Sequence, residues 1–349
     1  MLGAAAADPT RHRCPGDRLN GAMQLFLTLD AGGTSTRAVV HDATGTCLGY
    51  AVGSGGNPTA SGVAPVAATM RSTTEQALQR AGAQPAQVCH ALAAMAGSTV
   101  RLAGVDAGLR DLGVPVPLHL GSDLEAMFFS GTAALDGAAL VSGTGAAAIV
   151  VAGGVTTGRS DGRGWLLGDV GSGYWIARRV VRAATADLDH RGPRTALTDA
   201  LLSAAGVTGD RTSDKDALLD QLVSLLYAIP SPGIARFAPL AFDLADTDLI
   251  AGDIVEAAAE GLADTVLALG CADASSPLIV GGSVLYHQSG LRSTVTELLR
   301  DSDWTGPVHA VSDGTAGAIC MNLRRAGVAV DVPTHARIIA SLQQVRTNA

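Results

Sequence analysis

Lysine is almost absent from the chain of 349 residues, since 24 positions are Lys or Arg and only Lys215 is a lysine. A phosphate loop of the G-x-x-x-x-G-K-[ST] type, the lysine of protein kinases and most Schiff-base mechanisms each need a lysine in a defined context. Lys215 lies instead in a polar run that begins at Arg211. The sequence therefore excludes these three classes of protein.

Cysteine is sparse and unpaired in sequence. The five cysteines are far apart, with no C-x-x-C spacing and no nearby histidine partner, which argues against a zinc or iron–sulfur site within one chain. Apolar neighbours such as Val88 and Ile319 predict buried, reduced thiols. The cysteines are Cys14, Cys47, Cys89, Cys271 and Cys320.

Long apolar runs and an excess of positive charge are also missing. No stretch of 18 uncharged apolar residues occurs, and residues 1–23 lack the apolar centre of a signal peptide, so we expect a disordered tail there and a cytoplasmic protein. The net charge of −8 predicts no nucleic-acid partner and no membrane partner. The length predicts two domains of ordinary size.

Short apolar segments separated by glycine predict β-structure at the start of the ordered chain. Strands are expected at residues 25–29, 37–41 and 46–51, followed by a helix over 63–81. Two more strands are expected at 89–95 and 117–120, with a helix between them.

A second unit of strand, glycine turn and strand begins after Asp136. Residues 138–141 lead into a turn at 142–145 and a returning strand at 146–151, which predicts two domains built on one plan. Beyond it we expect mostly helices, together with one further strand. The strand is expected at 277–280, and a helix that follows Gly282 is expected to run to residue 300. The other helices are expected at 172–187, 216–228, 254–269 and 315–326.

The first glycine turn, residues 30–34, differs from a dinucleotide-binding loop because a strand and not a helix follows it. Glycine lets backbone N–H groups approach phosphate oxygens closely, and the Thr34 hydroxyl can add a donor. Asp30 cannot favour phosphate by itself, so its natural role is to hold a hydrated magnesium ion. For one such motif a plain tight turn is the simpler interpretation.

Repetition favours a functional interpretation. The turn at 142–145 would face the first across a cleft between the two domains and grip a polyphosphate from both sides. Gly281 and Gly282, which follow a buried strand and precede a helix, form a third close-approach site suited to an adenosine.

These three turns, in this order and spacing, resemble the two phosphate motifs and the adenosine motif of the superfamily that joins sugar kinases, heat-shock ATPases and actin. The run from Gly162 to Ile176, GRGWLLGDVGSGYWI, resembles the family of the N-acetylglucosamine kinases and the BadF/BadG/BcrA/BcrD-type ATPases. The resemblance covers residues 24 to about 326. It implies an α/β fold of two actin-like (ribonuclease H-like) domains, each a mixed sheet flanked by helices, with a cleft between them. The expected domains are 24–121, joined by a C-terminal helix at 327–345, and 122–326.

The resemblance also implies ATP and Mg²⁺ as cofactors and assigns residues to them. Asp30 is expected to bind the metal through water. The residues expected to bind ATP are Gly32, Gly33, Thr34, Ser35, Arg37, Gly143, Thr144, Gly145, Gly281, Gly282 and Ser283.

Asp123 is the candidate general base. Phosphoryl transfer to an alcohol needs a carboxylate that takes the hydroxyl proton, and Asp123 follows an apolar run, where α/β folds gather reactive groups. By resemblance it matches the catalytic aspartate of the N-acetylglucosamine kinases. The alternative is an aspartate that caps a helix beginning near Leu124, and both roles can coexist.

A set of polar and glycine residues matches the family's sugar site. Asp169 matches an aspartate that binds sugar hydroxyls, a task that suits a carboxylate with two acceptor oxygens, although it too could cap a helix. The residues expected to bind the sugar are Asn57, Pro58, Gly97, Asp123, Gly162, Arg163, Gly164 and Asp169. Trp165, Tyr174 and Trp175 fit the core equally well.

Two positions depart from the family's run. A tryptophan is usual where Arg163 stands, and a glutamate is usual where Val170 stands. Both departures lie beside the expected sugar site, so they bear on which sugar is preferred.

The expected function is ATP-dependent phosphorylation of N-acetyl-D-glucosamine at the 6-hydroxyl by a homodimer. Glucosamine, N-acetylmannosamine or a muramyl sugar are the alternative substrates. A BadF-type activator ATPase is the alternative activity, and it is disfavoured because no cysteine lies in a suitable glycine-rich loop. A sugar-sensing repressor is disfavoured because residues 1–23 are too short for a helix-turn-helix domain.

Overall fold

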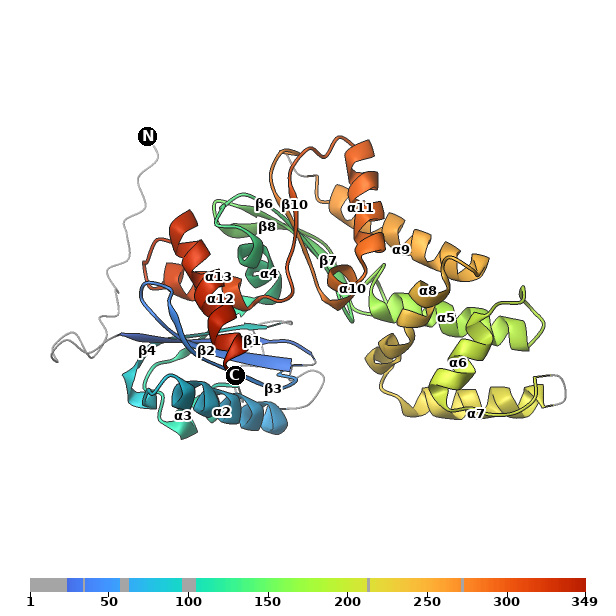
Figure 1. Ribbon diagram of the computed structural model, residues 1–349, viewed down its shortest axis with the longest axis horizontal. Helices are drawn as coiled ribbons and strands as arrows, with labels where there is room; N and C mark the ends of the chain where they lie inside the picture. The colour runs from blue at the N-terminus through green and yellow to red at the C-terminus, as the bar shows by residue number, and fades with distance from the viewer. Residues whose placement is uncertain (1–23, 34, 57–62, 96–104, 212–213, 271–272) are drawn as a thin grey trace, which may run out of the picture. The chain divides into compact units, whose positions relative to one another are not determined.

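The structure is a computed structural model, and it describes residues 24–349 except 34, 57–62, 96–104, 212–213 and 271–272 (Figure 1). The predictions for Thr34, Asn57, Pro58 and Gly97, and for the tail 1–23, concern residues outside the described part of the chain. The chain forms two compact units. The first contains the described residues up to Asp123 together with Ala318–Ala349, and the second contains Leu124–Gly317.

The first unit is built on a five-stranded mixed sheet. Its strands are β1 (Leu25–Ala31), β2 (Ser35–Asp42), β3 (Cys47–Ser54), β4 (Val88–Met95) and β5 (Leu118–Ser122). The spatial order is β3-β2-β1-β4-β5. The first three strands form antiparallel pairs, and β4 and β5 continue the sheet in parallel.

Helices cover both faces of this sheet. Figure 1 shows α2 (Val63–Arg80) and α3 (Val105–Leu112) on one face, with α12 (Thr315–Arg325) and α13 (Val332–Thr347) on the other. Every residue of β1 is buried, as a strand with two covered faces requires.

A buried polar network ties α12 to β1. The Asn322 Nδ2 group donates to the Leu27 carbonyl and to Thr28 Oγ1, both at 2.9 Å. Thr28 Oγ1 also lies 2.9 Å from Nε2 of His41. Burial lowers the pKa of His41 to about 4, so the ring is neutral at physiological pH. These contacts fix the end of α12 in the first unit.

The second unit repeats the strand plan of the first. Its strands are β6 (Gly137–Ser142), β7 (Ala146–Ala152), β8 (Val155–Asp161), β9 (Leu278–Gly281) and β10 (Val308–Ala310). The order β10-β9-β6-β7-β8 is the order of the first sheet written backwards, with the same antiparallel and parallel pairs. The predicted repeat and the predicted α/β class with mixed sheets are therefore confirmed.

The second unit contains most of the helices. They are α4 (Asp123–Gly131), whose first residue belongs to the first unit, α5 (Gly173–Leu188), α6 (Leu197–Ala205), α7 (Lys215–Ala228), η3 (Ser231–Phe237), α8 (Pro239–Leu244), α9 (Leu249–Leu267), α10 (Ser283–His287) and α11 (Ser289–Asp301). The large side chains of Leu140, Ile176, Leu201 and Leu262 are fully buried in the core between sheet and helices.

The helices predicted over 63–81, 172–187, 216–228, 254–269 and 315–326 are confirmed to within a few residues at most ends. A C-terminal helix was expected at 327–345, and α13 spans Val332–Thr347. Residues 318–326 were expected in the second domain, whereas Ala318–Ala349 lies in the first unit. The sequence pattern did not predict β8, β10, α6 or α8, and the single helix expected between Gly282 and residue 300 is observed as two helices, α10 and α11.

Cys47 and Cys320 confirm the prediction of buried thiols. Both side chains are buried and neither forms a disulfide, and burial raises the pKa of each thiol to about 12. Cys89 is half-buried, while Cys14 and Cys271 lie outside the described residues. Within the described part of the chain, no helix combines the length and the apolar character that a membrane span requires.

Candidate active site

The first glycine turn connects β1 to β2. Asp30 lies near the end of β1, is 7% exposed, and pairs across the strands with Arg37, whose Nη1 lies 3.9 Å from Asp30 Oδ2. The turn is closed by the Gly32 N–H group, which donates to the Ser35 carbonyl at 2.9 Å. Among the described residues, no atom lies within 4 Å of the position that a Cβ on Gly33 would take. The turn therefore leaves room beside its backbone.

A second glycine segment is attached to this turn. The Gly56 N–H group donates to the Gly32 carbonyl at 3.0 Å. A Cβ on Gly56 would lie 2.3 Å from Thr36 Oγ1, so a glycine is needed at this contact. The residue before Asn57 is thus held on the first turn. The sequence analysis did not single out Gly56, although the run Gly53-Ser-Gly-Gly was a signal for a close backbone approach.

Asp123 lies where the first sheet ends. Strand β5 ends at Ser122 and α4 begins at Asp123, which is half-buried. The predicted position just past a strand end and at the start of a helix is therefore observed. A carboxylate in the first turn of a helix is also stabilised by the helix dipole.

The second glycine turn, Gly143–Gly145, lies on the first residues of α5. The Gly143 carbonyl accepts a hydrogen bond from the Gly173 N–H group at 2.8 Å, and the Thr144 carbonyl accepts one from Tyr174 at 3.3 Å. The Gly143 N–H group donates to the Gly145 carbonyl at 2.9 Å. These bonds fix the orientation of the turn before any ligand arrives.

The predicted adenosine turn packs against the predicted phosphate turn. Gly282 has a φ of +86°, and a Cβ there would lie 2.4 Å from the Ser142 carbonyl oxygen and 2.9 Å from the Gly143 nitrogen. Ser283 follows as the first residue of α10, and its nitrogen lies 3.6 Å from the position of a Cβ on Gly143. The structure thus brings together Gly143 and Gly282, two turns separated by more than a hundred residues.

Asp169 lies against the same turn. A Cβ on Gly145 would lie 2.9 Å from Asp169 Oδ2. Asp169 is 8% exposed and adopts a left-handed backbone with a φ of +56°. Burial raises the pKa of its carboxyl, and the nearby Asp161 adds to that rise, although a hydrogen bond from the Ala146 N–H group opposes it. A buried, strained carboxylate with a perturbed pKa is typical of a functional site.

Asp161 holds Asp169 in place. Its Oδ1 accepts the Asp169 N–H group at 2.7 Å and its Oδ2 accepts the Val170 N–H group at 2.8 Å. Gly168 makes this approach possible, because a Cβ there would lie 2.0 Å from Asp161 Oδ1. The sequence analysis missed Asp161. The signal that could have found it was the Asp161-Gly162 pair at the end of a strand that it also missed.

The segment Gly162–Gly164 bends sharply beside Asp161. Gly162 and Gly164 have φ values of +65° and +87°, and the Gly162 carbonyl accepts Arg159 Nη2 at 2.8 Å. Arg163, between them, is exposed. Trp165, next in the chain, is 41% exposed and therefore lies outside the core.

Val170 packs on helix α9. Its Cγ1 lies 2.3 Å from where a Cβ on Gly261 would be, and the Val170 side chain is half-buried. Since Gly261 belongs to α9, the apolar side chain at position 170 contributes to packing between the segment after Asp169 and that helix.

The donor set fits a hydrated magnesium ion better than a protein-caged one. In the described part of the chain, no three His, Cys, Asp or Glu side chains converge as a metal would require. Mg²⁺ keeps several waters and binds through one or two carboxylates plus substrate phosphates. Asp30, with its carboxylate at the end of β1 beside a glycine turn, fits that kind of site.

Comparison with known proteins assigns the chain to a class. Residues 27–321 match the BadF/BadG/BcrA/BcrD ATPase family, and the chain belongs to that family. More particularly, an N-acetyl-D-glucosamine kinase from Dictyostelium discoideum is 32% identical over 160 residues, which is 44% of this chain and 47% of that protein. The matched region thus spans about half of that curated relative.

Solved structures show the same fold. A protein from Chromobacterium violaceum, provisionally described as an N-acetylglucosamine kinase, aligns with a TM-score of 0.67 at 23% identity over 86% of this chain and 99% of that one. A counterpart from Porphyromonas gingivalis, described in the same provisional way, has a TM-score of 0.64 at 20% identity over 86% and 99%. The ROK hexokinase of Thermus thermophilus has a TM-score of 0.53 at 18% identity over 87% and 99%.

Proposed function

We propose that this chain is an ATP-dependent sugar kinase that phosphorylates the 6-hydroxyl of N-acetyl-D-glucosamine, giving ADP and the 6-phosphate. The observation that carries the proposal is the assembly in the second unit, where the turn Gly143–Gly145 lies against both Gly282 and Asp169. A backbone surface suited to phosphates next to a buried carboxylate suited to hydroxyls is what a sugar kinase needs. Membership of the ATPase family and the kinase from Dictyostelium support the same function.

In this proposal the glycine turns bind ATP. Residues without a Cβ leave the main chain open to phosphate oxygens, and the space around Gly33 is open in this way. Gly282 and Ser283 serve the adenosine. Asp30 holds magnesium through water, and the ion when bound supplies charge neutralisation for the phosphates.

Asp169 binds sugar hydroxyls in this proposal, and Asp161 positions it. An ionised carboxylate can accept two hydroxyl hydrogen bonds in a fixed geometry. The left-handed backbone at Asp169 aims that side chain at Gly145, and the two hydrogen bonds that Asp161 accepts from the Asp169 and Val170 N–H groups hold the backbone in this conformation. Asp123 takes the proton of the hydroxyl that attacks the γ-phosphorus.

Another amino sugar is the second candidate substrate. The departure from the usual glutamate at Val170 is the reason to test it. The position that usually carries a glutamate here packs an apolar side chain towards Gly261. Arg163 is exposed beside the same segment. Glucosamine, N-acetylmannosamine and a muramyl sugar therefore belong in the test. We further propose a cytoplasmic homodimer, which sedimentation at several concentrations would test.

The test is product analysis after incubation with magnesium-ATP and each sugar in turn. Coupling of the phosphorus to sugar protons in the NMR spectrum identifies the phosphorylated oxygen. We expect N-acetylglucosamine to give the fastest conversion and a phosphate on O6. Phosphate on another oxygen, or conversion of another sugar at a higher rate, would replace the substrate assignment while leaving the kinase class intact.

A further inference from the structure

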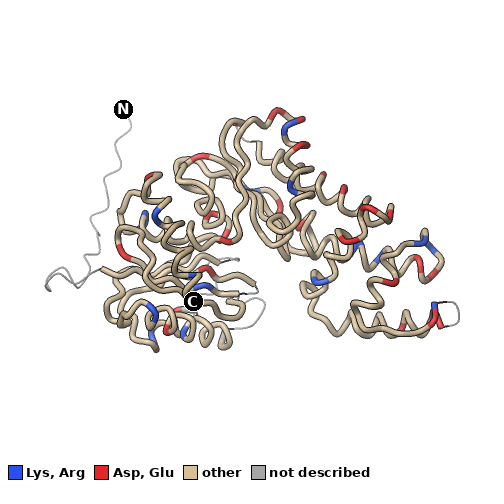
Figure 2. Tube along the Cα trace, viewed as in Figure 1, with Lys and Arg blue, Asp and Glu red and all other residues tan. Residues whose placement is uncertain are grey.

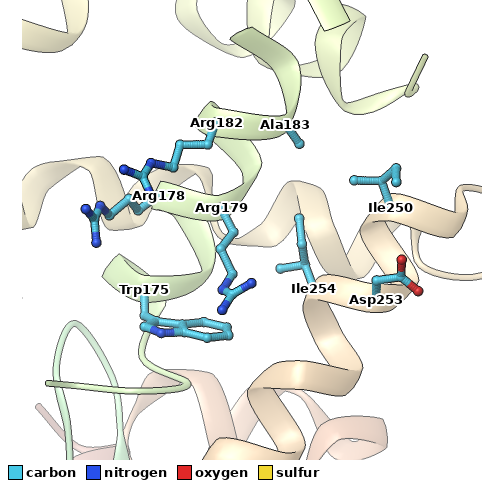
Figure 3. Close-up of a pocket in the computed structure, with 8 residues that line it drawn as sticks. All are labelled: Trp175, Arg178, Arg179, Arg182, Ala183, Ile250, Asp253 and Ile254. Carbon is cyan, nitrogen blue, oxygen red and sulfur yellow. The ribbon is translucent and has the colours of Figure 1, made fainter. Parts of the chain in front are cut away.

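A pocket lies between α5 and α9 (Figure 3). Its volume is about 410 Å³. Part of its lining is apolar and comes from Ala183, Ile250 and Ile254, while the rest is largely cationic. None of its lining residues belongs to Gly143–Gly145, to the Gly282 turn or to Asp169, so the pocket is separate from the proposed sugar and phosphate residues of this unit.

Three arginines from successive turns of α5 line this pocket, namely Arg178, Arg179 and Arg182. All three are exposed. Among the residues that the structure describes, no carboxylate forms an ion pair with any of them. Arg178 and Arg182 are four residues apart on one helix, a spacing at which like charges destabilise the helix. An anion bound between them would relieve that repulsion.

Arg179 is held in position by an aromatic ring. Its Cζ lies 3.9 Å from the ring centroid of Trp175, one turn earlier on α5, and Figure 3 shows the guanidinium over the indole. Such a cation–π contact keeps the guanidinium ordered while its N–H groups stay available. An ordered guanidinium loses less entropy when it binds an anion.

Two carboxylates of the neighbouring elements, Asp187 and Asp248, already accept hydrogen bonds from other groups. Asp187, at the end of α5, accepts hydrogen bonds from Thr198 and Arg211. Asp248 caps α9 through the Ala251 N–H group and also accepts Thr195 Oγ1. Asp253 also lines the pocket but forms no ion pair with the arginines, so three guanidinium groups outnumber one carboxylate in the lining.

We infer that this pocket binds a phosphomonoester, meaning a small organic molecule that carries a terminal phosphate dianion. One guanidinium group can donate two parallel hydrogen bonds to two phosphate oxygens. Three guanidinium groups that form no ion pair with a carboxylate therefore suit a dianion. A volume of about 410 Å³ lies within the range of sites for small organic ligands and exceeds what a bare phosphate fills. Ala183, Ile250 and Ile254 would contact the organic part. This inference does not depend on the proposed kinase activity.

The experiment is calorimetric titration of the full chain with glucose 6-phosphate, glucose and inorganic phosphate. The test variant is Arg178→Gln with Arg182→Gln. The matched control is Arg300→Gln with Arg325→Gln, which removes the same charge from two other exposed helical sites. A third protein, Asp169→Asn, removes the proposed sugar ligand and reports any binding at the candidate active site.

We expect glucose 6-phosphate to bind more tightly than inorganic phosphate, and glucose not to bind in this pocket. The test variant should weaken the sugar phosphate by about tenfold or more, as the loss of two charge-assisted contacts predicts. The control pair and Asp169→Asn should retain it. The inference is overturned if no phosphomonoester binds, if the control pair weakens binding as much as the test pair, or if Asp169→Asn abolishes it. Equal affinity for inorganic phosphate would overturn the organic ligand.

Discussion

The two sheets of this protein have the same strand order but different residues at the strand ends. Strand β1 carries Asp30 next to last, whereas its counterpart β6 ends on Ser142, whose hydroxyl donates to the Gly171 carbonyl at 2.8 Å. The first sheet therefore offers a carboxylate at this point, and the second offers only backbone and hydroxyl groups. The two sheets therefore share a strand order and differ in the polar groups at the ends of corresponding strands.

The fifth strands show the same contrast. Strand β5 leads directly into α4 at Asp123, whereas β10 leads through a short loop to α12. Asp313, in that loop, accepts the Thr315 N–H group at 3.0 Å and so caps the helix. The two aspartates occupy corresponding places in the repeat, but we assign chemistry to the first and helix capping to the second.

The connections between strands differ even more. Between β3 and β4 the described residues form the long helix α2 and the short 3-10 helix η1 (Pro85–Gln87), whereas α5 to α9 lie between β8 and β9. Figure 2 shows blue and red segments along the helices of the second unit. The additional helices carry the arginine pocket, which has no counterpart in the first unit's connection. The comparison predicts that residues at the strand ends carry out the proposed reaction. It also predicts that the helices α5 to α9, inserted between β8 and β9, provide an additional binding site.

The largest expected effect comes from the paired aspartates. Asp123→Asn should lower kcat for sugar phosphorylation by about 100-fold to 10,000-fold, because a general base contributes on that scale. Asn keeps the size of the side chain and is as good as Asp at a helix start. Asp313→Asn should change kcat by less than about twofold, since Asn can still cap. Equal losses in both variants would contradict the division of roles.

Two of the glycine turns, at Gly33 and at Gly282, should respond unequally to a methyl group. Gly282→Ala places a Cβ 2.4 Å from a backbone carbonyl at a φ of +86°, and should destabilise the fold by about 2 to 5 kcal/mol. Gly33→Ala meets open space and should change the free energy of unfolding by less than about 1 kcal/mol. Urea unfolding monitored by circular dichroism measures both. A tolerated Gly282→Ala would refute the close packing of the two turns.

Asp161 should behave as a positioning residue. Asp161→Asn keeps one acceptor oxygen for two backbone N–H groups, so Asp169 should lose its fixed orientation and the KM for sugar should rise about tenfold. The KM for ATP should stay the same. Asp136→Asn is the matched control, because Asp136 accepts one backbone N–H group in a turn of the same sheet. A fall in kcat with unchanged sugar KM would argue against positioning.

The smallest effect is a difference in sign between two buried aspartates. The raised pKa of Asp169 means that its charged form destabilises the folded state, and this cost appears as pH rises through the raised pKa. Asp169→Asn should therefore be slightly more stable than the parent at pH 7, with the difference vanishing as pH falls towards the ordinary value of 3.8. Asn also tolerates the left-handed backbone.

Asp187 should show the opposite sign. Burial raises its pKa, but hydrogen bonds from Thr198, Thr195 and Arg211 outweigh burial and lower it overall. Its charge therefore stabilises the fold above pH 3.8, and that stabilisation is lost as pH falls through the lowered pKa. Asp187→Asn should cost about 1 to 3 kcal/mol at pH 7. Thermal melting between pH 3 and pH 7 compares the two variants with the parent. If both variants are less stable than the parent at pH 7, the result contradicts the expectation that the charge of Asp169 destabilises the fold.

Strong local patterns made much of the fold predictable. The buried strand β1, its glycine turn and the long helix α2 have clear apolar spacing, and the repeat follows from two similar strand and turn units. Strand β8 escaped prediction because it is largely exposed and has no apolar alternation. The short strand β10 depends on pairing with β9, which no local pattern reports.

The candidate site was predictable from the sequence only where a residue type points to a particular local structure, as glycine points to a turn. Glycine turns were visible in sequence, but their packing depends on a contact between Gly282 and Ser142 far apart in the chain. The role of Asp161 depends on hydrogen bonds to backbone amides eight and nine residues later. A carboxylate that accepts hydrogen bonds from backbone amides outside a regular cap or turn, as Asp161 does, leaves no sequence motif, because any residue except proline can supply the amide.

The most direct test of the account is the rate of ADP release from magnesium-ATP, measured on the intact chain with and without N-acetylglucosamine. A sugar kinase should release ADP slowly without sugar and much faster when the amino sugar is present, and this is the result we predict. An equal rate with and without every amino sugar would contradict it.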